Sequence, residues 1–358
     1  MTSSEEATTI TATQNMTTTW EYVYYDEDDY QDELCNATSL SHFAKISSPL
    51  FLSVVTVLSL LGNIPVVVIV LKYENVKSLT NALILNLAVS DLLFAAALPF
   101  WAYYYAWGWA LGENACKLVS FVFNVGFYSS GLFLITMTAQ RHAAVLNPLS
   151  GLVSASGLYS LLASVLIWVA SIFLAVPTFL LTSIVEQSGK IHCEYDDSTS
   201  GRWGIYQQNF LFVLISGVFL FCYSQILCRL LSPLARRRKH KTLRLIFTLV
   251  MLFFIGWAPY NATLFLKSFR FWPQTPADSE TVAKSCNNHN LLEFTFHISR
   301  LLAFSHCCLN PVFYVFVGSK FKCHLKKMMG CRHHSEGEYR RRSRRVITSL
   351  SSGDDLCV

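Results

Sequence analysis

The stretch ISSPLFLSVVTVLSLLGNIPVVVIVL, residues Ile46–Leu71, contains no Asp, Glu, Lys or Arg. The apolar core of a bilayer is about 30 Å thick, so about 20 mostly apolar residues in a helix are enough to cross it. A helix suits that environment because it satisfies its backbone hydrogen bonds internally. This stretch therefore predicts a membrane-spanning helix, and it directs attention to other stretches of the same kind.

Six more stretches of this kind follow along the chain. They are Leu79–Tyr104, Leu118–Gln140, Gly157–Leu181, Trp203–Cys228, Leu245–Leu266 and Phe294–Gly318. Asp91 in the second span and Arg300 in the seventh are their only charged residues. Because none of the stretches shows the alternation of a strand, a barrel is disfavoured. The sequence predicts an all-α membrane protein, with a bundle of seven transmembrane helices over residues 46–318.

The composition agrees with a membrane protein and excludes several other classes. Of the 358 residues, 53% are hydrophobic and only 14% are charged, and the mean hydropathy is +0.38. A soluble domain usually carries about 25% charged residues, more than this chain has to cover a soluble surface of its size. The net charge of +5 comes from separated clusters, which argues against nucleic-acid binding.

The motifs also argue against catalysis and metal binding. The chain shows no catalytic or nucleotide-binding fingerprint, so we expect no enzyme activity and no organic cofactor. His306, Cys307 and Cys308 are consecutive, and consecutive helical residues point in different directions. We therefore expect no metal site there.

Basic residues set the expected orientation, because Lys- and Arg-rich loops stay in the cytoplasm. They lie between the first and second spans, between the fifth and sixth, and after the seventh: Lys72, Lys77, Arg236, Arg237, Arg238, Lys239, Lys241, Lys320, Lys322, Lys326 and Lys327. We predict a multi-pass plasma-membrane protein with residues 1–45 extracellular and residues 319–358 as a cytoplasmic tail. Glycosylation sequons at Asn15 and Asn36 agree with an outer N-terminal segment.

Four of the eleven cysteines lie in the expected outer segments, where disulfides form: Cys35, Cys116, Cys193 and Cys286. Four cysteines allow three connectivities. We pair Cys116, at the start of the third span, with Cys193, in the loop after the fourth. We pair Cys35 with Cys286, because these two flank the first and seventh spans, which adjoin in a closed ring of seven helices.

The N-terminal segment is rich in acids and tyrosines, and residues 20–33 read WEYVYYDEDDYQDE. Such a segment cannot bury enough apolar surface to fold alone, so we expect residues 1–45 to be disordered. It is either a solvated leader or, as we favour, an electrostatic attractant for a basic protein. Four tyrosines beside the acids are candidates for sulfation and ligand binding: Tyr22, Tyr24, Tyr25 and Tyr30.

Polar residues inside the spans need a physical reason, since an Asp at the bilayer centre costs about 2.5–3.5 kcal/mol. For Asp91 we favour a cation or water site over a satisfied helix-packing contact. Pro259, in Trp257-Ala-Pro259, predicts a kink that gives the bulky Trp257 the position of a lever. Arg300 is expected to face a wet cavity near the outer side, where an anionic or carbonyl partner can reach it. Arg141, taken alone, is typical of a side chain anchored at the membrane interface.

A set of these residues, in order along residues 46–325, resembles the rhodopsin-class G-protein-coupled receptors. The set comprises Gly62-Asn63, Leu87-Ala-Val-Ser-Asp91, Cys116, Arg141, Trp168, Trp257-Ala-Pro259 and Asn310-Pro-Val-Phe-Tyr314. Within that class, Ser305-His-Cys-Cys-Leu-Asn-Pro311, Trp109 before Gly112, the four outer cysteines and the acidic tail resemble the chemokine receptors. The segments Lys72-Tyr-Glu, Phe221-Cys-Tyr223, Trp257–Leu266 and Arg300 are similar to the XC class, which binds lymphotactin.

The resemblance implies a receptor for an XC-class chemokine that signals chemotaxis through inhibitory G proteins and calcium. It also implies a short amphipathic eighth helix beside the membrane after residue 318. The chemokine N-terminus would enter the bundle near Trp101, Phe123, Tyr260 and Arg300. Activation would involve Gln140, Arg141, His142, Tyr223, Trp257, Pro259, Asn310, Pro311 and Tyr314. A sodium ion would bind at Asp91, Ser130 and Asn310.

Other partners implied are arrestin and a receptor kinase, through Ser and Thr residues of the C-terminal tail. Contact with membrane lipid is expected along the spans, and palmitoylation at Cys323 and Cys331 is as consistent with the sequence as plain thiols.

One departure from the family pattern keeps alternatives open. The usual Asp-Arg-Tyr at the end of the third span is Gln140-Arg141-His142 here, and Gln cannot hold the Arg by charge. A scavenging chemokine receptor without G-protein coupling is therefore an alternative, as is a CC-type receptor. A transporter is disfavoured, because the chain shows no repeated halves.

Overall fold

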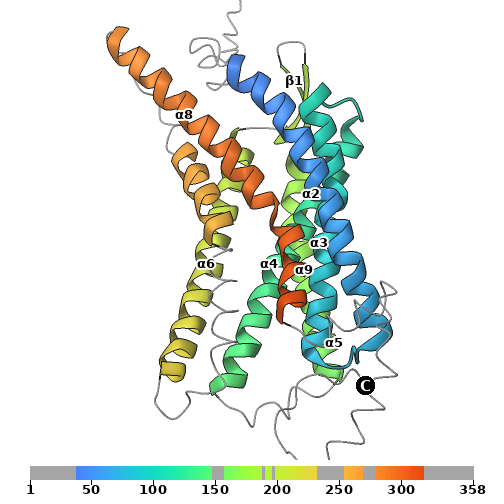
Figure 1. The fold of residues 1–358 in the computed structure, drawn as a ribbon. Coiled ribbons are helices and arrows are strands. Elements are labelled where there is room, and N and C mark those ends of the chain that lie inside the picture. The colour runs from blue at the N-terminus through green and yellow to red at the C-terminus, as the bar shows by residue number, and fades with distance from the viewer. Residues whose placement is uncertain are drawn as a thin grey trace, which may run out of the picture.

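The computed structural model describes residues 38–146, 157–187, 190–195, 198–231, 254–268 and 279–317. Long helices lie side by side with alternating direction and form a bundle (Figure 1). The predicted N-terminal tail up to residue 37, residues 245–253 of the predicted sixth span and the predicted juxtamembrane helix lie outside the described residues.

The helices correspond to the predicted spans in chain order. The first five spans are α2 (Thr38–Tyr73), α3 (Leu79–Trp107), α4 (Glu113–Leu146), α5 (Gly157–Leu181) and α6 (Ser198–Leu231). Residues 254–268 form the described part of the sixth span. The seventh span comprises α8 (Ser279–Phe304) and α9 (His306–Val317). In the described residues, five helices (those from α2 to α6) are long and apolar enough to cross a membrane.

Most helices extend beyond the apolar stretches that predicted them, and one extension corrects a boundary. The first helix begins at Thr38, so residues 38–45, predicted as part of a disordered tail, are helical. Counting apolar residues finds only the part of a helix that lies in lipid, whereas backbone hydrogen bonding continues into the polar layer.

The seventh span differs from the prediction of one continuous helix, because it is interrupted at Ser305. The amide of Ser305 lies 3.2 Å from the carbonyls of both Leu301 and Leu302, and the amide of Cys308 donates to the Ser305 carbonyl at 3.1 Å. These contacts form a tight turn in place of the regular ladder. The interruption separates α8 from α9.

Large apolar side chains cover the outside of the bundle, as expected where lipid is the surrounding medium. On α5, Phe173 is 76% exposed and Leu180 is 66% exposed. The buried face of α5 instead carries small residues: Ser160, Ser164, Ser171, Ala175 and Thr178. Small residues let membrane helices approach closely, so α5 packs against α3 and α4 through this face.

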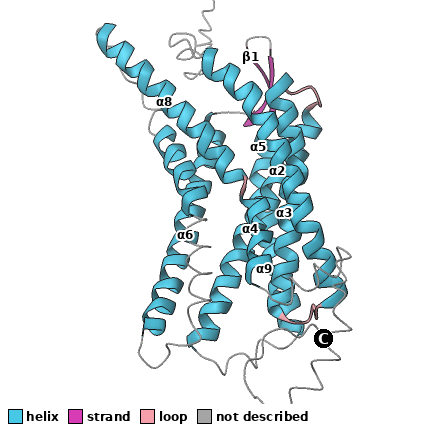
Figure 2. Cartoon of the chain, in the orientation of Figure 1, coloured by secondary structure: helices cyan, strands magenta, loops and turns pink. Residues whose placement is uncertain are grey.

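Two antiparallel strands follow α5 at one end of the bundle, as Figure 2 shows. Strand β1 (Thr182–Gln187) pairs with β2 (Lys190–Tyr195), with Ile184 opposite Cys193. We call this end of the bundle the hairpin end. Burial raises the pKa of Tyr195 on β2, whose hydroxyl lies 3.3 Å from that of Thr178. This contact joins the hairpin to the end of α5.

Candidate functional site

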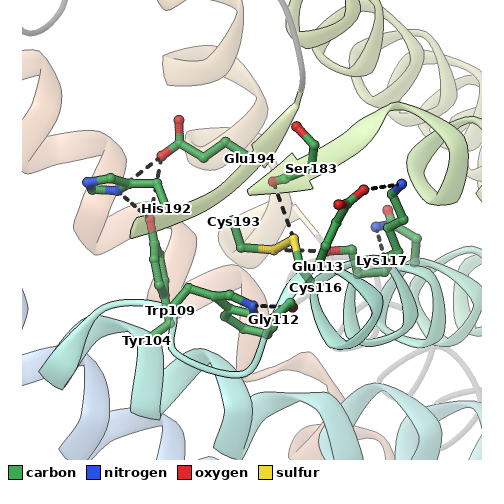
Figure 3. The surroundings of a disulfide bond; sticks show 12 residues. Tyr104, Trp109, Gly112, Glu113, Cys116, Lys117, Ser183, His192, Cys193 and Glu194 are labelled. Carbon is green, nitrogen blue, oxygen red and sulfur yellow. Dashed lines mark hydrogen bonds and ion pairs between the residues drawn. A yellow bond between two sulfur atoms is a disulfide. The ribbon is translucent and has the colours of Figure 1, made fainter. Parts of the chain in front are cut away.

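The hairpin is fixed to the third span by a disulfide between Cys116 of α4 and Cys193 of β2 (Figure 3). The two Cα atoms are 5.7 Å apart, and both side chains are buried. This pair confirms one of the two predicted disulfides. Cys286 is also disulfide-bonded, and Cys35, its predicted partner, lies outside the described residues.

The loop before α4 is shaped by Trp109, which is only 2% exposed. Its indole nitrogen donates to the carbonyl of Gly112 at 2.9 Å, while its backbone amide donates to Ile191 of β2 at 3.0 Å. Gly112 has a φ of +80°, a conformation that side-chain-bearing residues rarely adopt. The Trp109 and Gly112 pair thus holds the loop against the hairpin.

The ligand-binding residues predicted within the bundle lie toward the hairpin end, on four different spans. Trp101 and Phe123 pack against the same buried cluster between α2, α3 and the seventh span. The Tyr260 hydroxyl donates to Gln208 of α6 at 2.9 Å, and its ring stacks on Phe296 of α8 at 5.7 Å. Helix α8 also carries Arg300, so residues far apart in the sequence meet in one aromatic region.

Arg300, predicted to face a wet cavity where an anionic or carbonyl partner can reach it, is partly exposed and has aromatic rings as its neighbours. Its guanidinium carbon lies 5.1 Å from the ring centre of Tyr105 and 5.2 Å from that of Phe296. Its one polar contact among the described residues is with His297, at 3.4 Å. Arg300 is therefore held between aromatic rings, and no acid of the described residues pairs with it.

Asp91 lies at the centre of the bundle and is completely buried. One carboxylate oxygen accepts a hydrogen bond from Ser130 at 2.9 Å, and the other accepts one from Asn310 at 2.8 Å. Both partners are neutral donors, and within the described residues no cation pairs with Asp91. The three side chains predicted to form a sodium site are thus brought together, and their oxygens suit a hard monovalent cation.

Beside this centre, Asn63 satisfies a backbone carbonyl that Pro311 leaves without a partner. Proline has no N–H, so the carbonyl of Cys307, four residues earlier, lacks its helical hydrogen bond. The amide nitrogen of Asn63 donates to that carbonyl at 2.8 Å. This contact ties α9 to the first span.

Trp257 lies in a chain of ring contacts that begins near the predicted ligand-binding residues. Ring centres are 4.5 Å apart for Phe123 and Phe94, 4.7 Å for Phe94 and His306, and 5.0 Å for His306 and Trp257. Trp257 is 8% exposed and also contacts Phe127 at 4.9 Å. A displacement of rings near Phe123 would therefore meet Trp257 through direct contacts.

At the end opposite the hairpin, neutral hydrogen bonds surround Arg141. The Gln140 amide donates to the Thr80 hydroxyl of α3 at 2.9 Å, and His142 lies 3.3 Å from Gln225 of α6. Thr138, one turn before His142, lies 3.3 Å from the Tyr223 hydroxyl. Arg141 itself is exposed, and no ion pair holds it within the described part of the chain.

Comparison with known proteins identifies the family. The sequence model of the 7 transmembrane receptor (rhodopsin family) matches residues 62–314. Chemokine XC receptor 1 of Homo sapiens is 40% identical over 308 residues, covering 86% of this chain and 87% of the relative. The chain belongs to the rhodopsin family of seven-transmembrane receptors. Its chemokine-receptor relatives include Chemokine XC receptor 1 of Mus musculus, 40% identical over 309 residues, with 85% of this chain and 89% of the relative covered.

A relative from another chemokine class matches this rhodopsin-family receptor less closely. C-C chemokine receptor type 4 of Homo sapiens is 34% identical over 299 residues, covering 82% of this chain and 81% of the relative. The order of identities places the receptor nearer to the XC relatives than to this CC relative.

Several predicted site residues of the receptor lie outside the described residues. They are the tail tyrosines Tyr22, Tyr24, Tyr25 and Tyr30, the sequons at Asn15 and Asn36, and Cys323 and Cys331, which are predicted to be cytoplasmic. Tyr314 belongs to α9, but its side chain lies outside the described part. Pro259 lies within the helical residues 254–268, where its carbonyl accepts a hydrogen bond from Thr263 at 3.0 Å.

Sequence reasoning missed several residues that shape the receptor's site. Phe296 precedes Arg300 by four residues, a spacing that puts two side chains on the same face of a helix. The contact between these two residues could therefore have been predicted from the sequence. Tyr105, Thr80 and Gln225 carried no such signal, because each meets its partner only through contact between different helices.

Proposed function

We propose that the receptor binds a basic chemokine of the XC class and signals chemotaxis through inhibitory G proteins and calcium. The observation that carries this proposal is the 40% identity to Chemokine XC receptor 1 of two species over most of the chain. The 34% identity to a CC receptor favours the XC class over the CC class.

The proposed capture has two stages. The acidic N-terminal tail, with Tyr22, Tyr24, Tyr25 and Tyr30 as sulfation sites, attracts the basic body of the chemokine. The flexible N-terminus of the chemokine then enters the bundle at the hairpin end. This orientation puts the hairpin outside the cell and Arg141 in the cytoplasm, in agreement with the basic residues around the cytoplasmic loops. Glycans on Asn15 and Asn36 and a Cys35–Cys286 disulfide belong to the same proposal.

The geometry offers a route from capture to signalling. Ligand contact at Trp101 and Phe123 bears on a chain of neighbouring rings that reaches Trp257 through Phe94 and His306. A ligand that binds one arrangement of these rings better shifts the receptor toward that arrangement. At the cytoplasmic end, an exposed Arg141 without an ion-pair partner among the described residues is available to a G protein.

Further elements of the proposal concern the ion and the regulators. A sodium ion held by Asp91, Ser130 and Asn310 would supply the positive charge that the buried carboxylate lacks among the described residues. Phosphorylation of the cytoplasmic tail by a receptor kinase would recruit arrestin. Lipid covers the apolar outer faces of α5 and α6.

A panel of chemokines tests the proposed function in transfected cells. We expect lymphotactin to raise calcium and lower cAMP, and the CC chemokines of the panel to be much weaker. Arg141→Ala is the matched control, because it should bind the same chemokine at the cell surface without the calcium response. If no chemokine binds, the proposal fails.

The scavenging alternative rests on the missing acid of Gln140-Arg141-His142, and the same cells distinguish it. A scavenger would bind and internalise lymphotactin without a calcium or cAMP response. That outcome would leave chemokine binding in place and overturn G-protein signalling.

Gln140→Asp is expected to lower basal inhibitory signalling several-fold at matched surface expression. An acid at this position can accept a charge-assisted hydrogen bond from Arg141, and such bonds are about twice as strong as neutral ones. A bias of a few kcal/mol between two states changes the active fraction many-fold. Ligand capture at the other end should be unchanged.

The control for this variant is Gln140→Asn, which has nearly the shape of Asp without its charge. Equal basal signalling of the Asp and Asn variants would show that charge at position 140 does not restrain the receptor. A gain of ligand-driven signalling that the parent lacks would favour the scavenging alternative.

A further inference from the structure

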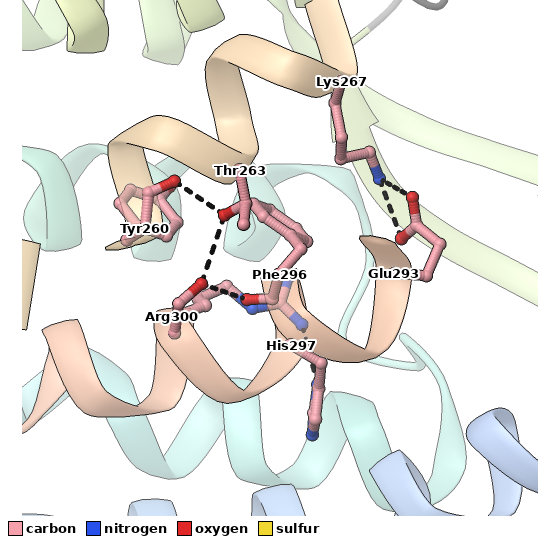
Figure 4. A network of polar contacts seen from close by, with 8 residues as sticks. Tyr260, Thr263, Lys267, Glu293, Phe296, His297 and Arg300 are labelled. Atoms are coloured by element: carbon pink, nitrogen blue, oxygen red, sulfur yellow. Dashed lines mark hydrogen bonds and ion pairs between the residues drawn. The ribbon is translucent and has the colours of Figure 1, made fainter. Parts of the chain in front are cut away.

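The guanidinium of Arg300 is enclosed by aromatic rings from two helices. Tyr105 of α3 lies on one side at 5.1 Å, and Phe296 of α8 contacts it at 5.2 Å (Figure 4 shows Phe296 and Arg300). The Nε atom of Arg300 is buried and has no hydrogen-bond partner among the described residues. Rings attract a cation but do not neutralise it, so the positive charge stays available.

Among the described residues, this guanidinium has one polar partner, and that partner is itself held in place. Arg300 can only donate, so Nδ1 of His297 accepts at 3.4 Å, which leaves the proton of the neutral imidazole on Nε2. That nitrogen lies 3.2 Å from the hydroxyl of Ser47 on α2. His297 is therefore a neutral acceptor fixed to the first span, and the charge of Arg300 has no acidic partner in the described part of the chain.

The acid on the same helix face as Arg300 is Glu293, and it already has an ion-pair partner. Glu293 precedes Arg300 by seven residues, two turns along α8, a distance that two long side chains can close. Instead, its carboxylate oxygens lie 2.8 and 2.9 Å from the ammonium of Lys267. Both side chains of this ion pair are only 22% exposed. The pair joins residues 254–268 to α8.

Phe296 separates the occupied acid from the unpaired cation. Its ring lies 4.7 Å from the Lys267 ammonium and 5.2 Å from the Arg300 guanidinium, and Tyr260 stacks on it. The ring therefore borders a neutral ion pair on one side and, on the other, a positive charge that no described acid compensates. Figure 4 shows the Lys267–Glu293 pair on the far side of Phe296 from Arg300.

We propose that Arg300 is preorganised to bind a carboxylate on the segment of the ligand that enters the bundle. Tyr105 and Phe296 are positioning residues for its guanidinium, and Lys267 keeps Glu293 from taking the carboxylate's place. This inference rests on the proposed function. A planar guanidinium binds a carboxylate through two parallel hydrogen bonds, and removal from water strengthens such a pair. The site thus selects an acidic side chain over a neutral or basic one.

The first test uses lymphotactin and variants in which each acid before its first cysteine is changed to the amide. On the parent receptor, one of these changes should lower the potency of the calcium response at least tenfold. On the Arg300→Gln receptor the same change should have no effect, because the cation that binds the carboxylate is gone. Equal losses on both receptors would overturn the proposal.

Phe296 is tested in a double-mutant cycle with Arg300. Phe296→Leu should lower the potency of lymphotactin about tenfold in the parent, which corresponds to about 1.4 kcal/mol. In the Arg300→Gln background, Phe296→Leu should change potency little. Phe296→Tyr keeps the ring, so its potency should be close to that of the parent. A merely structural ring would give the same loss in both backgrounds, and that result would contradict a positioning role.

Lys267→Met tests the role of the ion pair. It should free Glu293 to pair with Arg300 and lower lymphotactin potency, whereas Lys267→Met combined with Glu293→Gln should recover most of it. No recovery in the double variant would show that the ion pair does not protect Arg300. Binding of lymphotactin to the parent is measured beside each variant, so failure of the proposed function itself would be seen as absence of that binding.

Discussion

Gly126→Leu is expected to abolish the folded receptor at the cell surface. A Cβ atom at position 126 of α4 would lie 2.5 Å from the backbone nitrogen and 2.8 Å from the Cα of Phe94 on α3. These are backbone atoms, so no side-chain rotation relieves the clash and the two helices must separate. Overpacking usually costs about 1–3 kcal/mol, and a longer side chain against backbone should cost more.

Gly126→Ala provides the graded version of this experiment, and Gly217→Ala provides the control. A Cβ at Gly217 of α6 meets nothing within 4 Å, so alanine there should be neutral or slightly stabilising. The measurements are surface expression and the midpoint of thermal unfolding in detergent. If Gly126→Ala and Gly217→Ala behave alike, α3 and α4 are not in the close contact described.

Loss of the Cys116–Cys193 disulfide should have the second-largest effect, removing ligand capture along with much of the stability. The bond closes a separation of 77 residues. Removing a native disulfide typically costs about 2–5 kcal/mol. It would also release β2 from α4 and with it the loop that Trp109 anchors. Cys116→Ser should therefore lose lymphotactin binding as well as surface expression.

The matched control is Cys228→Ser, because Cys228 is an exposed free cysteine. The double variant Cys116→Ser and Cys193→Ser should be no worse than either single variant, since the three lack the same bond. A double variant that binds lymphotactin like the parent would show that the hairpin keeps its place without the disulfide.

The sequence predicts the bundle well because a helix needs about 20 mostly apolar residues to cross the bilayer. Apolar stretches of sufficient length, each with at most one charged residue, predict the seven spans, and the predicted Gly157–Leu181 matches α5 at both ends. The interruption at Ser305 could not be predicted in this way, since no glycine or proline marks it. The β1–β2 hairpin was likewise missed, because its strands are short and partly polar.

Within the candidate site, the residues that carry family motifs were predictable, and their partners from other helices were not. Asp91 and Asn310 come from short motifs, and the structure brings them together. Arg300 could be identified from the sequence because a charged side chain inside a membrane span is costly and usually functional. Its enclosure by Tyr105 depends on how α3 packs against α8, and nothing local in the sequence records that packing.

The turn at Ser305 decides which parts of the molecule can shift together. Helix α8 is joined to residues 254–268 by the Lys267–Glu293 pair and by the hydroxyls of Thr263 and Ser299, 3.2 Å apart. Helix α9 is joined to the first and second spans, which it contacts directly, and α8 also meets the first span, where Nε2 of His297 lies 3.2 Å from the Ser47 hydroxyl. A pull on α8 would thus reach the sixth span through these side-chain contacts and α9 through the chain, and the two paths meet again where the ring centre of His306 lies 5.0 Å from that of Trp257.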